Sequence, residues 1–158
     1  SGDVLHAPGH VIQIVNHQDS TVAATSTVIP ADDSIPQKTE GAEFMTLAIT
    51  PKSASNKLFI QVVMCGTATT ANRQIASALF QDDTANALKA AGHYQSVATG
   101  LVTVNFNYYM TAGTTSATTF KVRGGASAGN YTFNGYQNTN RNFGGVSASS
   151  ITVMEIAG

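Results

Sequence analysis

The sequence predicts an all-β fold, an antiparallel β-sandwich or jelly-roll-like domain. Apolar residues alternate in short segments, turn-forming residues separate these segments roughly every ten to fifteen positions, and long helical periodicity is missing. The clearest alternation is LVTVNFNYYM at 101–110, with five large apolar side chains on one face and Thr, Asn and Tyr on the other. Because each buried side chain of this size contributes about 1.5–3 kcal/mol, we expect this strand at the centre of the core.

The first elements follow in order from local composition. Residues 10–16 (HVIQIVN) are expected to form a strand, and the β-branched run at 21–29 a second one. Residues 30–43, which contain Pro, Asp-Asp and Glu-Gly, are expected to form a long exposed loop. The FMTLAI segment at 44–49 then reads as a strand that ends before Pro51.

The segment KLFIQVVMC at 57–65 is apolar on both faces. Its even positions are large and aliphatic, while Phe59, Val63 and Cys65 lie on the opposite face. A strand with two apolar faces is typical of a fully covered position. We therefore expect this strand at the middle of the sandwich or against another subunit.

Residues 75–81 fit either a strand or a helix, since Ile75 and Leu79 are also spaced as on one helical face. A strand is favoured because the turn at 82–84 (Asp-Asp-Thr) allows residues 86–91 to return as its partner.

The remaining elements are strands separated by one short and one long connection. Residues 92–100 are expected to be a loop, 118–122 (TTFKV) a strand, and 150–156 (SITVMEI) the closing strand. Between the last two, residues 124–145 are rich in Gly and Asn with interleaved aromatics, which predicts a loop-rich region.

The length predicts one domain at residues 10–158, preceded by a linker at 1–9 in which Ser1-Gly2 is expected to be a cloning remnant of a piece of a longer protein. With 42% apolar residues the chain is expected to be ordered. Cys65 is the single cysteine and lies in an apolar run, so we expect it to be buried and no disulfide to form within the chain.

Charge is scarce and balanced. Charged residues make up 11% of the chain, the net charge is −1, and the eight Lys and Arg residues are scattered singly. This pattern argues against nucleic acid as a partner, and no apolar run is long enough for membrane insertion. Because charged residues are depleted where subunits meet, the composition predicts a surface partly covered by other copies of the chain.

The search for catalytic and metal motifs is negative, so we expect no enzymatic activity, no cofactor and no metal. The chain contains no Gly-x-Ser-x-Gly, no His-Glu-x-x-His and no phosphate-binding loop. A pair of sugar-cleaving carboxylates, for example Glu40 and Glu43, stays open on spacing alone. Pro8-Gly9 prevents a helical metal pair of His6 and His10, although copies of one His from three chains could converge on an axial ion.

The best candidate for binding is NYTFNGYQNTNRNF at 130–143. Sugars are bound by aromatic faces together with planar amide and guanidinium donors, and this segment contains both. A weaker candidate is the His-Tyr pair of the 92–100 segment, for which a plain solvated loop is the alternative. The candidate receptor-binding residues are Asn134, Tyr136, Asn138, Asn140, Arg141, Phe143, His93 and Tyr94.

A structural alternative applies to the same segment. Tyr131 and Phe133 alternate as strand residues do, so they are expected to pack inward, with Asn134-Gly135 as a hairpin turn. Tyr136, Arg141 and the asparagines are then expected to be exposed.

Several blocks together resemble the C-terminal domains of bacteriophage tail fibres and related virion structural proteins. The blocks are GHVIQIV, LAITPKSASNKLFI, MTAGTTSATTFKV, TFNG and ASSITVMEIAG, and they extend over residues 9–158. The resemblance implies a compact β-sandwich at the distal end of a fibre and a homotrimer about a long axis. It carries over no catalytic residue.

The resemblance also implies a function in host attachment. We expect a non-enzymatic virion protein, assembled in the host cytoplasm, that binds a bacterial surface glycan or an outer-membrane receptor through its tip loops. The alternative is a purely structural domain that trimerises or caps a virion protein.

Overall fold

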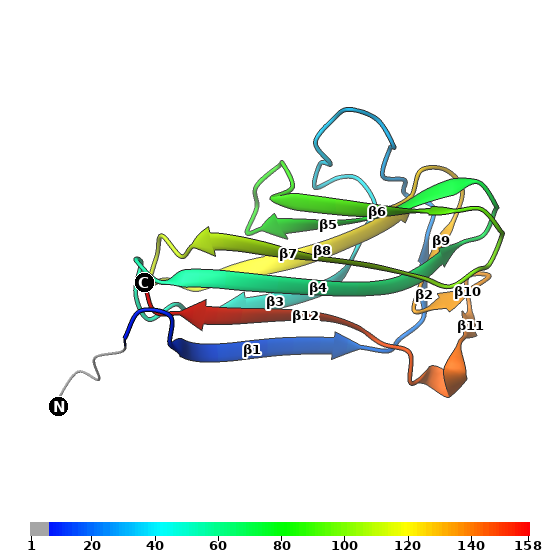
Figure 1. The fold of residues 1–158 in the computed structure, drawn as a ribbon. Coiled ribbons are helices and arrows are strands. Elements are labelled where there is room, and N and C mark those ends of the chain that lie inside the picture. Colours follow the sequence, from blue (N-terminus) through cyan, green and yellow to red (C-terminus); the bar gives the residue numbers. More distant parts are fainter. Residues whose placement is uncertain (1–6) are drawn as a thin grey trace.

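The computed structural model describes residues 7–158, which form two large antiparallel β-sheets packed face to face and a separate two-stranded sheet at one end (Figure 1). The strands are β1 (Val11–Asp19), β2 (Ala23–Thr25), β3 (Ala42–Ile49), β4 (Lys57–Ala68), β5 (Arg73–Gln81), β6 (Lys89–Gln95), β7 (Val102–Thr111), β8 (Thr118–Ala126), β9 (Tyr131–Phe133), β10 (Gly135–Tyr136), β11 (Asn140–Arg141) and β12 (Ser149–Ile156). A single 3₁₀ turn, η1 (Phe143–Gly145), is the only helical element in the described part. The all-β prediction is confirmed.

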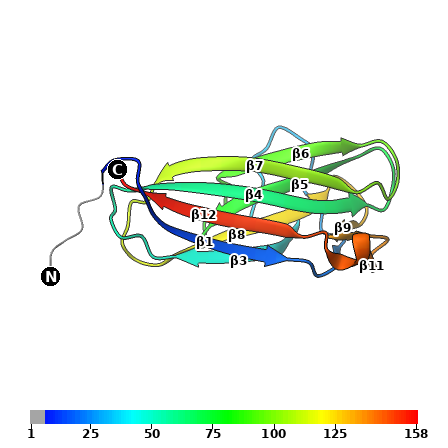
Figure 2. The ribbon, with the colours of Figure 1, turned by 60° about the horizontal axis from the view of Figure 1, so that its bottom comes forward.

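Strand β4 is the centre of the first sheet. It pairs with β12 on one side and with β7 on the other, and its last residues pair with β9, which in turn pairs with β2. Figure 2 shows β1, β12, β4 and β7 side by side across one face of the molecule. The segment 101–110 is β7, and it contributes to the core as expected, but its expected place as the central strand is wrong, because it lies at the edge of this sheet.

The predicted alternation of β7 is nevertheless confirmed. Val104 and Phe106 are buried, whereas Asn105, Asn107 and Tyr109 are exposed. Alternation identifies which side chains face the core, but it carries no information about which strands lie to either side.

The second sheet has the order β3, β8, β5, β6. Residues 75–81 belong to β5, so the strand prediction is confirmed and the helix alternative is wrong. The partner strand β6 lies further along the chain than predicted. The prediction of a loop at 92–100 is therefore wrong in its first half, because Gly92 to Gln95 pair with β5.

The core lies between the two sheets. From the first sheet, Leu58, Ile60 and Val62 of β4 are fully buried; from the second, Phe120 and Val122 of β8 are fully buried. This confirms that one face of 57–65 is apolar and buried. The opposite face is mixed, because Phe59 and Val63 are half-buried, Gln61 is exposed and Cys65 is buried.

Two segments differ from their predicted structure because tertiary contacts override local composition. Only Ala23–Thr25 of the predicted strand at 21–29 is a strand, and the backbone then crosses to the second sheet, where Ile29 N donates to Ala126 O at 3.1 Å. Within 124–145, β8 continues to Ala126 and β9 forms Tyr131–Phe133.

The first described residues and the C-terminus lie together at one end of the sandwich (Figure 1). Gly9 N donates to Ala157 O at 2.9 Å, and Ala157 N donates to His10 O at 2.8 Å. His6, one of the two candidate ligands of an axial ion, lies outside the described residues. Strands β10 and β11 lie at the opposite end. No helix in residues 7–158 has the length and apolar character needed to span a membrane.

Candidate functional site

Residues 134–145 form a compact structure at the end of the sandwich opposite the C-terminus, which we call the tip hairpin (Figure 1). It consists of β10, β11 and η1. Gly135 pairs with Arg141 and Tyr136 pairs with Asn140. Five of the eight predicted binding residues are in its exposed or half-buried part, so the structure brings this group together.

Asn134 is the anchor of the tip hairpin and not a contact residue. It is 1% exposed, and its Nδ2 donates to Asp19 O at 2.8 Å and to Thr21 O at 3.1 Å. Its Oδ1 accepts a 2.7 Å hydrogen bond from Ser149 Oγ. The prediction that this asparagine is exposed is wrong, because the backbone of two neighbouring connections uses its amide as a partner.

The expected turn at Asn134-Gly135 is also wrong. The chain reverses after Tyr136, where Gln137 and Asn138 have φ angles of 49° and 70°. Asn138 N donates to Thr132 Oγ1 at 3.0 Å, which fixes this turn against β9. Gly135 is required here because a Cβ atom would overlap the carbonyl oxygen of Asn140.

The structural alternative, in which the aromatic side chains of β9 pack inward, is confirmed. Tyr131 and Phe133 are each 1% exposed. Phe133 stacks on Phe44 with ring centroids 4.6 Å apart, and the Tyr131 hydroxyl donates to Cys65 O at 3.2 Å. Neither ring is available to a ligand.

The exposed part of the tip hairpin combines the groups that bind sugars. Phe143 is 75% exposed with a φ of 49°, a conformation that non-glycine residues rarely adopt. Arg141 is exposed and lies over Gly145, and its guanidinium makes no hydrogen bond or ion pair with residues 7–158. Tyr136 is half-buried, while Asn138 and Asn140 are exposed.

His93 and Tyr94 form a separate group. Both are exposed on β6, but they point to opposite faces because neighbouring residues of a strand alternate. Tyr94 lies opposite Gln74 and its hydroxyl donates to Asn72 Oδ1 at 3.1 Å, whereas His93 lies opposite the buried Ile75. Within the described chain, no hydrogen bond or ring contact joins either residue to the tip hairpin.

The outer face of the first sheet, formed by β1, β12, β4 and β7, carries side chains in rows across the strands. One row is apolar and the next is polar without charge: Ile14, Met154, Phe59 and Tyr109, then Asn16, Thr152, Gln61 and Asn107. Lys57, hydrogen-bonded to Thr111 at one end, is the only charged residue at an outward position of these four strands. We call this surface the uncharged face.

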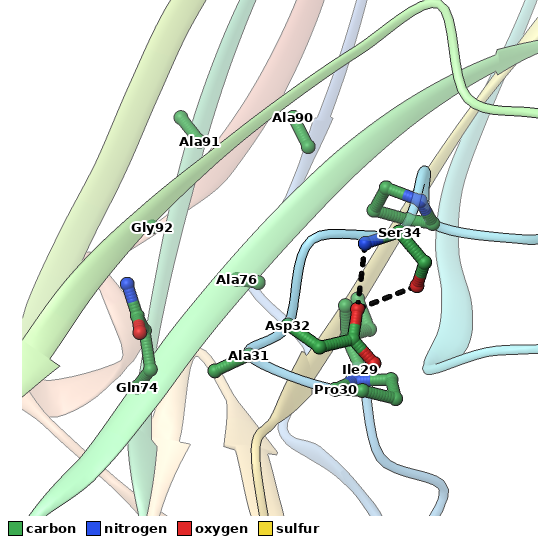
Figure 3. Close-up of a pocket in the computed structure, with 11 residues that line it drawn as sticks. Ile29, Pro30, Ala31, Asp32, Ser34, Gln74, Ala76, Ala90, Ala91 and Gly92 are labelled. Carbon is green, nitrogen blue, oxygen red and sulfur yellow. Dashed lines mark hydrogen bonds between the residues drawn. The ribbon is translucent and has the colours of Figure 1, made fainter.

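A shallow groove, missed in the sequence, lies over the second sheet (Figure 3). Its floor is the outer face of β5 and β6, its wall is the 29–36 segment, and its volume is about 330 Å³. The sequence signal that could have indicated it is the run of Ala and Gly at alternate positions of β5 and β6, since small side chains leave space above a sheet.

The structure gives the candidate carboxylates other partners. Glu40 Oε2 accepts a 3.0 Å hydrogen bond from Gln37 N, and Glu43 lies 3.8 Å from the guanidinium of Arg123. No cluster of three or more His, Cys, Asp or Glu side chains that could bind a metal occurs within residues 7–158.

No protein-family model and no curated protein sequence matches the chain. Among solved structures, Eiger TNF from S. frugiperda is similar at 11% identity and a TM-score of 0.50, with 91% of this chain and 93% of that chain covered. This likeness shows the fold alone, a jelly roll, as the sequence predicts.

Viral structures show weaker likeness. The infectious bursal disease virus Gx strain structure gives 14% identity and a TM-score of 0.48, covering 94% of this chain and 33% of that chain. An enzymatically active domain of bacteriophage CBA120 tailspike protein 4 gives 16% identity and a TM-score of 0.25, covering 94% and 19%. The chain therefore spans a third or less of these viral chains.

Proposed function

We propose that this chain is a homotrimeric receptor-binding domain at the tip of a bacteriophage tail fibre, which attaches the virion to a bacterial surface glycan or outer-membrane receptor. The resemblance of its sequence blocks to tail fibre C-terminal domains supports this proposal, and the jelly-roll fold is compatible with it. In this proposal the domain performs no catalysis and needs no cofactor.

The observation that carries the proposal is the chemistry of the tip hairpin. An exposed aromatic ring in a strained backbone conformation, an unpaired guanidinium and two exposed amides lie together on a short hairpin that is rigidly anchored by Asn134. Strained exposed residues are typical of functional sites. In a fibre joined through the N-terminal end of the domain, the tip hairpin lies at the far end and meets the host surface first.

The uncharged face supports the proposed trimer. A residue that lies close to a threefold axis approaches its own copies, so a charged residue there would approach like charges. Amides such as Gln61 and Asn107 can hydrogen-bond to a copy of themselves, and Phe59 and Tyr109 can pack on one. Three weak glycan sites on one rigid axis then gain avidity from effective concentration.

A double substitution in the tip hairpin tests the attachment function. Tyr136→Ala with Arg141→Ala removes a ring face and the unpaired cation, so we expect host-cell adsorption of particles to fall at least about tenfold, equivalent to about 1.4 kcal/mol. The matched control is Lys52→Ala with Thr115→Ala, two exposed positions at the opposite end. Particles that assemble and adsorb normally with the tip variant would contradict the proposed site.

Deletion of the whole domain separates attachment from the structural alternative. Assembled fibres that no longer adsorb agree with receptor binding. Failure of the fibres to assemble would instead favour a domain that only trimerises or caps the virion protein.

The trimer is tested by placing a charge on the uncharged face. The wild-type chain is expected to sediment at three times its 16.4 kDa mass. Gln61→Glu is expected to yield monomers, because three buried like charges near one axis cost on the order of several kcal/mol. Thr46→Glu, an exposed position on the second sheet, is the control and should stay trimeric. A wild-type monomer in dilute buffer would refute the trimer.

A further inference from the structure

The groove over the second sheet is held open by an anchored loop. At one end of the loop, Ile29 N donates to Ala126 O at 3.1 Å; at the other, Lys38 N donates to Ala85 O at 2.8 Å and Ala87 N to Pro36 O at 2.9 Å. Between these attachments the chain arches away from the sheet (Figure 1). The hollow beneath it is therefore part of the fold and does not depend on a loose loop.

The floor of the groove is unusually small and smooth. Ala76, Ala90 and Gly92 lie on neighbouring positions of β5 and β6 and face the loop (Figure 3). A second hollow of about 330 Å³ continues the groove, since Ser34, Pro36 and Ala90 line both hollows. Volumes of this order are at the lower end of the range for small-molecule sites.

Two side chains supply polar groups without internal partners. Asp32 Oδ1 accepts hydrogen bonds from Ser34 N at 2.9 Å and Ser34 Oγ at 2.5 Å, whereas its Oδ2 accepts none from residues 7–158 (Figure 3). These hydrogen bonds lower the pKa of Asp32, so the carboxylate is ionised at neutral pH. The Gln74 side-chain amide, at the other side of the groove, likewise has no hydrogen bond within the described residues.

An aromatic ring flanks the Gln74 end. Tyr94 is 60% exposed and lies directly across from Gln74 in the pairing of β5 and β6, so the two side chains share the outer face of the sheet. Its hydroxyl is bound to Asn72, which orients the ring. A carboxylate acceptor and an amide that can donate and accept thus border one apolar floor, and the Tyr94 ring lies beside Gln74, outside the residues that line the two hollows.

We propose that this groove is a binding site for a neutral saccharide of one or two rings, with Asp32 and Gln74 hydrogen-bonding its hydroxyl groups and its ring lying on the floor of Ala76, Ala90 and Gly92. The site is distinct from the tip hairpin and does not depend on the function proposed for it.

The chemistry of the groove favours an uncharged sugar over other ligands. Asp32 is the only ionised residue that lines the main hollow, whereas Lys89 lines the hollow that continues it. A uronic acid or another anion bound in the main hollow would therefore be repelled by Asp32. The backbone groups of β5 and β6 bond to each other in the plane of the sheet, so they cannot recognise an extended peptide lying over the floor. Hydroxyl groups suit the free carboxylate and amide, and the apolar face of a sugar ring suits the alanines and prolines that line the groove.

Ligand-observed saturation-transfer NMR on the intact chain tests the proposal directly. The probes are the methyl glycosides of glucose, galactose, mannose and N-acetylglucosamine, with methyl glucuronide as the acidic counterpart. We expect transfer to at least one neutral glycoside and weaker or no transfer to the glucuronide. Absence of transfer to all neutral probes, or preference for the glucuronide, would overturn the proposal.

Two variants locate the binding. Asp32→Asn keeps an Oδ1 acceptor for Ser34 but replaces the charged Oδ2, and Ala90→Leu fills the floor. Each variant is expected to weaken the affinity for the neutral glycoside with the strongest saturation transfer at least about fivefold, the equivalent of one hydrogen bond. Ala98→Leu, at an exposed position in the connection between β6 and β7, is the matched control.

The same titration separates the groove from the tip hairpin. The Tyr136→Ala, Arg141→Ala double variant should bind the neutral probe as the wild type does. Binding that survives both Asp32→Asn and Ala90→Leu, or that is lost in the tip variant alone, would overturn the groove as the site while leaving the adsorption experiment to decide on the tip.

Discussion

Replacement of Gly66 by alanine is expected to destabilise the domain by about 3 kcal/mol, combining overpacking with the loss of one hydrogen bond. A Cβ atom at this position would overlap the tip of the Tyr131 ring and lie 2.6 Å from its Cε2 atom. The ring cannot retreat, because Tyr131 is 1% exposed, packs on Phe44 and donates its hydroxyl to Cys65 O. Urea unfolding at fixed protein concentration measures the loss as a lower midpoint.

A second variant shows whether the Tyr131 ring is the cause. In Gly66→Ala with Tyr131→Leu the new methyl group occupies space that the ring has vacated, so the double variant should be no less stable than Tyr131→Leu alone. Gly100→Ala is the control: its Cβ would lie 3.2 Å from the exposed Val97 side chain and 3.7 Å from Val97 O, the latter an ordinary van der Waals distance. Equal midpoints for Gly66→Ala and Gly100→Ala would contradict the packing argument.

Local alternation predicted most of the strands, but the order of the strands within each sheet depends on contacts between distant parts of the chain. The face of 101–110 that is buried follows directly from its sequence, since Val104 and Phe106 alternate with Asn105 and Asn107. The other side of β4, its neighbour in the sheet, is occupied by β12, whose residues lie 87 to 99 positions further along the chain than their partners in β4. No property of 101–110 itself encodes that pairing.

The candidate site was predictable in composition but not in geometry. The polar and aromatic content of the tip hairpin identified Tyr136, Arg141 and Phe143, all of which are at least partly accessible. Asn134 has the same composition signal yet is buried, because connections that are distant in sequence supply the partners of its amide. The groove was missed because its wall and floor are brought together by contacts between segments distant in sequence, such as the hydrogen bond from Ile29 N to Ala126 O and the bridge between Gln37 and Asn86.

Glu155 is a buried carboxylate whose inward position follows from strand alternation, although alternation does not predict the hydrogen-bond partners that stabilise it there. It follows Ile151 and Val153 on the inward face of β12 and is fully buried. Its carboxylate accepts hydrogen bonds from Gln13 Nε2 at 2.6 Å and Asn56 Nδ2 at 2.6 Å. The backbone N–H groups of Lys52 and Ser53 add bonds of 2.7 and 3.3 Å. One side chain thereby fixes the connection between β3 and β4.

Burial by itself opposes ionisation of Glu155, but the hydrogen bonds from Asn56, Gln13, Lys52 and Ser53 together outweigh it and lower its pKa in the folded state. A carboxyl group whose pKa is lower when folded stabilises the protein fully above its unfolded pKa of 4.5. This contribution is lost as the pH falls through the folded pKa, because the protonated carboxyl group has no charge and accepts these four hydrogen bonds more weakly than the carboxylate does.

Glu155→Gln is therefore expected to destabilise the domain by about 3 kcal/mol at pH 7, because an amide offers one acceptor oxygen to four donors and leaves others unpaired. The difference from the wild type should shrink as the pH falls below about 4.5, since the protonated wild-type acid then resembles the amide. Urea unfolding of both proteins at pH 7 and pH 3 measures this. Glu43→Gln, a half-exposed carboxylate, should change stability at pH 7 by less than about 1 kcal/mol. A Glu155→Gln effect that is equally large at both pH values would show that packing, not the charge, sustains this connection.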